Sequence, residues 1–230
     1  MITFTRLHLL RLRRSPLARA GIFSSVVLPV MLVVSTLLLA RISETADRVL
    51  PEVLAGGPAC FGVFIAVSFA GWAPASIAHD ERVERRVSVL RASGVDGIRA
   101  VLELTLIALS CAAVTSLGGL ATSAVIALVQ RGSLGTVGLQ AVCATLAGVA
   151  LGSIAATMQS IAGRAVWAVV NGVCAIVFAG VIVAAGSDRS FPWGVLLGAL
   201  MLVSAACVTL ALGVAHLARR FPTRMMDPWT

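Results

Sequence analysis

One stretch of the chain decides its class: LTLIALSCAAVTSLGGLATSAVIALVQ, residues 104–130, which carries no formal charge. A helix that crosses the hydrocarbon core of a bilayer needs about 20 predominantly apolar residues. Because the stretch exceeds that length, it predicts a membrane-spanning helix that tilts or that begins as an interfacial turn.

The composition of the whole chain agrees with a membrane location. Of its 230 residues, 59% are hydrophobic and 12% are charged, whereas an ordinary soluble domain is about 25% charged. A soluble fold of this length could not bury so much apolar surface. A water-soluble enzyme is therefore excluded, and residues 1–230 are expected to form a single transmembrane domain.

Five further stretches resemble the first in length and apolar character. They cover residues 20–40, 58–78, 136–160, 165–186 and 193–217. The first of these is too long for a signal peptide, and more spans follow it. The predicted fold is all-α, a polytopic membrane protein with six transmembrane helices. Residues 1–19 are expected at the membrane surface, and residues 218–230 form a tail.

Basic residues are distributed unevenly over this arrangement. All 18 are Arg; 14 fall in the N-terminal segment, the loop between spans two and three, the turn at Arg164 and the C-terminal tail, and four fall elsewhere. Because basic residues collect on the cytoplasmic side of membranes, both termini are expected in the cytoplasm. An even number of spans places both termini on the same side, which agrees with this. The net charge of +8 thus indicates topology, and no nucleic-acid partner is expected.

The cytoplasmic loop at residues 79–103 holds ten of the 28 charged residues. Val83, Val87 and Leu90 share one face of a predicted helix. Gly94 is placed to end that helix, and Asp96 to cap a second helix that leads into the third span. Five Arg are balanced by five acids, whereas a lipid-binding helix is plainly basic. This favours a docking helix for a cytoplasmic partner over an interfacial helix that only shapes topology.

The loop resembles that of a known family, the transmembrane subunits of ABC transporters of the type-2 exporter family. The matching residues are Glu81-Arg82 through Glu84-Arg85, then Leu90-Arg91-Ala92-Ser93-Gly94-Val95, together with Arg14-Ser15-Pro16-Leu17 before the first span. The chain departs from the family at Arg86-Val87-Ser88-Val89, where Gly-Thr-Leu-Glu is frequent, and at Glu103, where Lys is common.

The resemblance implies a mechanism and partners. The family works as a dimer of permease subunits, identical or different, bound to two copies of a cytoplasmic ATPase subunit that holds ATP and Mg. The loop acts as a coupling helix, which transmits closure of the ATPase to the spans. The residues expected to dock on the ATPase are Glu81, Glu84, Arg85, Arg86, Leu90, Arg91 and Ser93. The expected location is the bacterial cytoplasmic membrane, and an Arg-only basic set agrees with a GC-rich bacterial genome.

No catalytic residue, metal or bound cofactor is expected in this chain itself. An ATP-binding P-loop requires Lys, which the chain lacks, and no HExxH motif is present. The five Cys lie far apart within apolar runs, which argues against a zinc site or a disulfide framework. The chain is thus expected to be no enzyme by itself but the permease part of an ATP-hydrolysing complex.

In the family, the second and fifth spans tend to line the transport pathway. The corresponding residues here are Phe61, Phe64, Trp72, Trp167, Asn171 and Phe178. An aromatic, uncharged lining suits a hydrophobic or amphipathic substrate, such as a lipid, a drug-like molecule or a modified peptide. Aromatic residues that face lipid are equally ordinary, and for Asn171 a hydrogen bond between helices is favoured over substrate contact.

Two pairs of glycines and two prolines bear on helix packing. Gly148 and Gly152 form one GxxxG pair, and Gly194 and Gly198 form another. Such pairs let helices approach closely, and packing within one subunit is favoured over packing between subunits. Pro29 and Pro74 are placed to kink the first and second spans.

Two other functions remain open at this point. One is an importer-type ABC permease, since Ala92-Ser93-Gly94 faintly resembles the docking loop of that class. That loop's Glu-Ala-Ala and later Leu-Pro are missing, however. The other is a membrane scaffold or immunity protein that binds a partner without transport.

Overall fold

In a computed structural model of the chain, Leu10 and residues 16–42, 46–83, 97–129, 134–187 and 191–220 are described. These residues form α2 (Pro16–Ile42), α3 (Ala46–Val83), α5 (Gly97–Val129), α6 (Leu134–Ser187) and α7 (Trp193–Arg220). The described part of the chain contains no strand. The expectation of an all-α fold is therefore confirmed for this part.

Five helical segments among the described residues are long and apolar enough to cross a membrane. They are Gly57–Ala75 in α3, Leu104–Leu128 in α5, Leu134–Ala155 and Ala165–Gly186 in α6, and Trp193–Val214 in α7. These correspond to the second to sixth predicted spans. For the first span, the described side chains of α2 form a shorter apolar stretch, Arg19–Ser35. The chain is thus a multi-pass helical membrane protein by length and composition.

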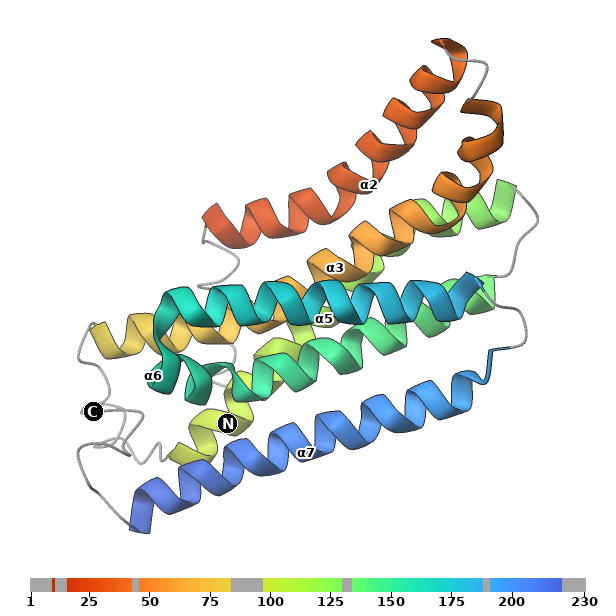
Figure 1. Ribbon diagram of the computed structural model, residues 1–230. Coiled ribbons are helices and arrows are strands. Elements are labelled where there is room, and N and C mark those ends of the chain that lie inside the picture. Colours follow the sequence, from red (N-terminus) through yellow and green to blue (C-terminus); the bar gives the residue numbers. More distant parts are fainter. Residues whose placement is uncertain are drawn as a thin grey trace.

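Successive segments alternate in direction, so that their ends gather at two opposite ends of the bundle (Figure 1). The start of α2, the end of α3, the start of α5 and the end of α7 lie toward one end, together with the reversal of α6 (Figure 1). These are the helix ends that adjoin the Arg-rich connections of the sequence. The arrangement brings the two flanks of the charged loop to the same end of the bundle.

α6 differs from the sequence-based prediction. Two spans separated by a turn at Arg164 were expected, whereas the backbone is helical from Leu134 to Ser187. The chain nonetheless reverses within α6, whose two halves lie antiparallel (Figure 1). Gln140 of the first half lies against Gly186 of the second. No proline occurs in α6, so the reversal is not caused by a proline kink.

α3 also begins earlier than predicted. The second span was placed at residues 58–78, so residues 41–57 were expected to connect it to the first. In the structure residues 46–57 are helical and continuous with the span, because α3 begins at Ala46. Its first turns stand at an angle to the rest of α3 (Figure 1).

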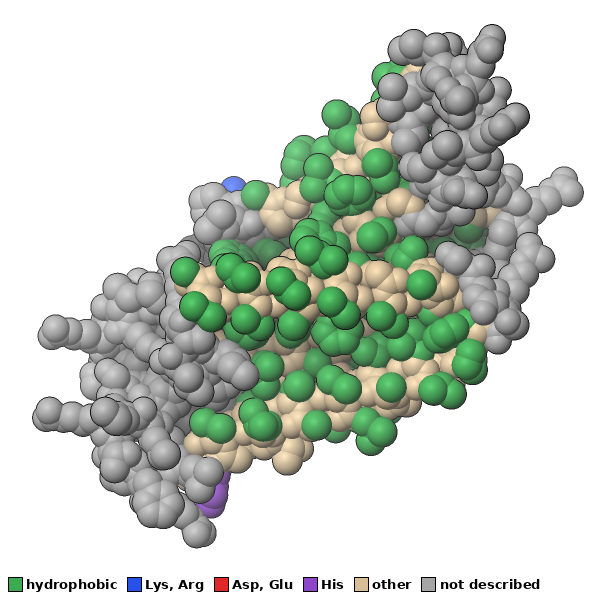
Figure 2. Space-filling model, in the orientation of Figure 1, with side chains coloured by type: hydrophobic (Ala, Val, Ile, Leu, Met, Phe, Trp, Pro, Cys, Tyr) green, Lys and Arg blue, Asp and Glu red, His purple; other side chains and the backbone are tan. Residues whose placement is uncertain are grey.

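α3 is the central helix and α7 the peripheral one. α3 packs against α2, α5 and α6, whereas α7 packs mainly against α6. Within the apolar segments, 72% of the α3 segment is buried inside the bundle but only 17% of the α7 segment. One face of the molecule shows mostly hydrophobic side chains between its ends (Figure 2). Such a surface is suited to contact with lipid chains.

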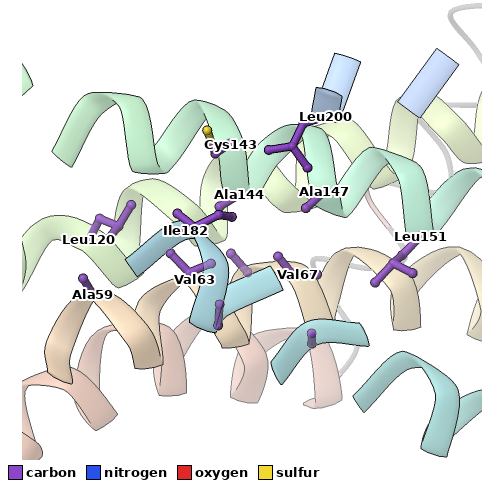
Figure 3. Close-up of a cluster of buried hydrophobic side chains, with 13 residues drawn as sticks. Ala59, Val63, Val67, Leu120, Cys143, Ala144, Ala147, Leu151, Ile182 and Leu200 are labelled. Atoms are coloured by element: carbon purple, nitrogen blue, oxygen red, sulfur yellow. The ribbon is translucent and has the colours of Figure 1, made fainter. Parts of the chain in front are cut away.

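The core consists largely of small side chains. Its main cluster draws on α3, α5, both halves of α6, and α7 (Figure 3). The buried members are Ala59, Val63, Ala66, Val67, Leu120, Cys143, Ala144, Ala147, Leu151, Ala175, Ala179, Ile182 and Leu200. Between helices in a membrane, close packing rather than the hydrophobic effect drives association. A core rich in alanine allows this close approach.

Candidate functional site

Most of the predicted docking residues lie outside the described residues. Glu81 falls in the last turn of α3, which ends at Val83. The others, Glu84, Arg85, Arg86, Leu90, Arg91 and Ser93, belong to the undescribed segment 84–96. The helix expected after Asp96 is present, since α5 begins at Gly97 and continues into the third apolar segment. The charged loop is therefore joined to the bundle by helix on both flanks.

Two predicted pathway residues, Trp167 and Asn171, meet α3 from the second half of α6. Asn171 Nδ2 donates a hydrogen bond to the carbonyl oxygen of Ser68 at 2.9 Å. Trp167 Nε1 donates to the carbonyl oxygen of Gly71 at 3.4 Å. Both side chains are buried, at 6% and 4% exposure. The hydrogen bond between helices that was favoured for Asn171 is confirmed.

Gly71 makes room for this contact. A Cβ atom at position 71 would collide with Oδ1 of Asn171, so only glycine lets the amide lie flat against α3. Oδ1 of Asn171 and Oγ of Ser68 are buried and have no hydrogen-bond partner. An unpaired polar atom is costly in an apolar interior. The α3–α6 contact is thus a polar point in surroundings that are otherwise apolar.

The four other predicted lining residues, all of them aromatic, make contacts elsewhere. Phe64 and Phe178 are partly buried and pack against the main core cluster. Trp72 stacks on Phe69, with ring centroids 5.6 Å apart. Phe61 is 42% exposed and stands on the surface of α3. Within one copy of the chain, the six residues thus lie on α3 and α6 and take part in several separate contacts.

The two glycine pairs differ sharply in their surroundings. A Cβ at Gly148 would stand 2.8 Å from the Cβ atoms of both Ala70 and Ala112, which lie on α3 and α5. A Cβ at Gly152 would collide with Ala108. Nothing lies within 4 Å of the same position at Gly194 or Gly198. The first pair therefore packs within the subunit as predicted, and the second faces open space in this chain.

Three further contacts between helices were not predicted from the sequence. Gly62 of α3 and Gly119 of α5 meet backbone to backbone, since a Cβ at Gly119 would stand 2.6 Å from Cα of Gly62. Ser204 of α7 donates to the carbonyl oxygen of Leu146 at 2.8 Å. The hydroxyl groups of Ser116 and Thr145 lie 3.3 Å apart. Small and hydroxyl residues in the spans are the sequence signal for such contacts, but they do not reveal their partners.

All five cysteines are free thiols. Among the described residues, no group of three or more His, Cys, Asp or Glu side chains is placed to hold a metal ion. Comparison with protein-family models, with curated proteins and with solved structures finds no match to this chain. Any assignment of function therefore rests on the residues of the chain and on their geometry.

Proposed function

We propose that this chain is the transmembrane subunit of an ATP-driven ABC transporter of the type-2 exporter family, which works with a separate cytoplasmic ATPase. The observation that carries the proposal is the helical continuity on both sides of the charged loop. α3 stays helical past Asp80 to Val83, and α5 is helical from Gly97, before Arg99. The loop that resembles the family's coupling element therefore connects two spanning helices.

Such a connection suits the transmission of force. A partner bound to the loop acts directly on α3, whose apolar segment is the most buried of the five. α3 is in turn tied to the second half of α6 through Asn171 and Trp167. A partner that binds one of two arrangements of the bundle more tightly than the other would shift the equilibrium between these arrangements. Two such chains, identical or different, would enclose the pathway between them.

The proposed substrate is hydrophobic or amphipathic, such as a lipid, a drug-like molecule or a modified peptide. The five apolar segments contain no Asp, Glu, Lys or Arg. A pathway between such helices offers no fixed charge to a hydrophilic ion. Export rather than import is proposed because of the loop motif, in which Leu90-Arg91-Ala92-Ser93-Gly94 replaces the importer pattern.

The docking assignment is tested by reversing two charges of the loop. The chain carrying Glu84→Arg together with Arg85→Glu is co-expressed with a candidate ABC ATPase subunit, and the complex is purified. We expect co-purification and stimulated ATP hydrolysis to fall about tenfold, because like charges at a docking surface cost several kcal/mol. The measurements are the ratio of the two subunits and the ATPase rate in lipid.

A matched reversal on the other side serves as the control. Arg48→Glu with Glu52→Arg changes the same charge types in the segment that precedes the second span, and it should leave both measurements unchanged. Normal assembly and hydrolysis with the first pair would show that the loop does not dock. A chain that recruits no ATPase at all would favour the scaffold or immunity function.

A further inference from the structure

Pro74 interrupts the hydrogen-bond ladder of α3 in the second half of the helix. It is fully buried, and Ala75 beside it is buried as well. Proline has no N–H, so the carbonyl group of Ala70, four residues earlier, has no donor within the helix. That carbonyl faces Gly152 of α6, with its oxygen 2.9 Å from where a Cβ would stand.

Trp167 bridges this interruption from the side. Its indole N–H donates to the carbonyl oxygen of Gly71, which precedes Pro74. Its side chain packs in a buried cluster with Ala75, which follows Pro74, and with Ala155 of α6. One side chain therefore contacts α3 on both sides of the proline. One helical turn further along α6, Asn171 holds the carbonyl oxygen of Ser68.

These contacts divide α3 into two parts. The part before Pro74 is fixed by α5 and α6, and the part from Ala75 to Val83 continues as about two turns of helix into the charged segment. We propose that Pro74 and Trp167 form a hinge between these two parts, in which Trp167 is the positioning residue that holds them in register. The hinge is a property of this chain and needs no partner. That it transmits the movement of a docked ATPase to α6 rests on the proposed function.

Hydrogen–deuterium exchange of the purified full chain in lipid nanodiscs tests the hinge without any partner. Pro74→Ala restores a donor for the carbonyl of Ala70 and should slow amide exchange over residues 75–83 about tenfold, because it returns a hydrogen bond that proline removes from the helix interior. Pro29→Ala in α2, the matched control, should leave exchange in residues 75–83 unchanged. Exchange in Pro74→Ala within about twofold of the unmodified chain would overturn the proposal.

Trp167→Phe provides a second variant that does not depend on the folding of Pro74→Ala. It keeps an aromatic ring on Ala75 but removes the N–H that holds Gly71, so exchange over residues 75–83 should rise about threefold. Trp72→Phe is its control, since Trp72 stacks on Phe69 instead. Equal exchange in Trp167→Phe and the unmodified chain would overturn the positioning role of Trp167.

The use of the hinge is measured in the complex with the ATPase. The Pro74→Ala chain should assemble normally with the ATPase. The stimulated ATPase rate should fall about tenfold, because a stiffened α3 transmits less movement. Normal stimulation would overturn the coupling role while leaving the exchange result intact. Failure of the unmodified chain to bind any ATPase would instead overturn the proposed function, and the exchange measurements would still decide whether the hinge exists.

Discussion

Gly148 and Gly152 lie where α6 crosses both α3 and α5. The space that their side chains would occupy is filled by Ala70, Ala108 and Ala112. Helix backbones that approach this closely leave no flexible side chain to move aside. At these positions a single added carbon must displace a helix, so the identity of the residue determines the geometry of the bundle.

The two glycine pairs provide a matched test of this conclusion. Gly148→Val should lower the stability of the chain by about 1–3 kcal/mol, because overpacking a tight contact forces the backbone apart. Gly198→Val makes the same change in open space and should stay within about 0.5 kcal/mol of the unmodified chain. Thermal unfolding of the detergent-solubilised protein measures both. Equal losses in the two variants would contradict the packing described for α6.

At the scale of elements, α6 behaves as a helical hairpin in which the turn keeps helical backbone. Its halves are held in register by the contact of Gln140 with Gly186 and by the core cluster to which both contribute. Hydropathy located both halves correctly, since each is a run of apolar residues. It could not show that the backbone between them stays helical, because hydropathy reports only where each apolar run ends.

Disulfide cross-linking tests the register of the hairpin. In a background without the native cysteines, Gln140→Cys with Gly186→Cys should form a disulfide under mild oxidation, because the amide group of Gln140 lies against Gly186 and the two positions therefore face each other across the hairpin. Gly180→Cys, at a position with nothing within 4 Å, should not cross-link to Gln140→Cys. The readout is a gel band whose mobility changes on reduction. Cross-linking of both pairs would mean that the register is wrong.

For α3, local patterns indicated its existence but not its partners. The prolines and small residues of this helix, among them Pro58, Gly62, Ala66, Ala70 and Pro74, recur every four residues. They form one face that packs against α5 and α6 at several points. Sequence reasoning found two GxxxG pairs and treated them alike. Only the positions of distant helices distinguish the buried pair from the open one, and a local motif does not contain that information.

For the whole molecule, the helix directions and the distribution of Arg are two independent features that agree. The helix ends beside the Arg-rich connections gather at one end of the bundle (Figure 1), although hydropathy and charge were read separately from the sequence. The predicted docking residues depend on segment 84–96, which lies outside the described residues. Their assignment therefore rests on the motif, while the framework that would support them is visible.

The orientation in the membrane is tested by labelling single cysteines in intact cells. In a background without the native cysteines, Ser190→Cys between α6 and α7 should react with a membrane-impermeant maleimide. Ser88→Cys in the charged loop should react only after the membrane is permeabilised, because basic segments stay in the cytoplasm. The opposite labelling pattern would mean that the chain is inserted the other way round.

The hydrogen bond between Ser68 and Asn171 has a consequence for synthesis of the chain. The two residues are 103 positions apart, and ribosomes add about 5–20 residues per second. α3 therefore resides in the bilayer for roughly 5–20 seconds before the helix that covers Gly71 has been made. During that interval the face of α3 that carries Gly71 and the carbonyl group of Ser68 contacts lipid or the insertion machinery. The yield of inserted protein in the cell should consequently depend on this face of α3 as strongly as the stability of the finished bundle does.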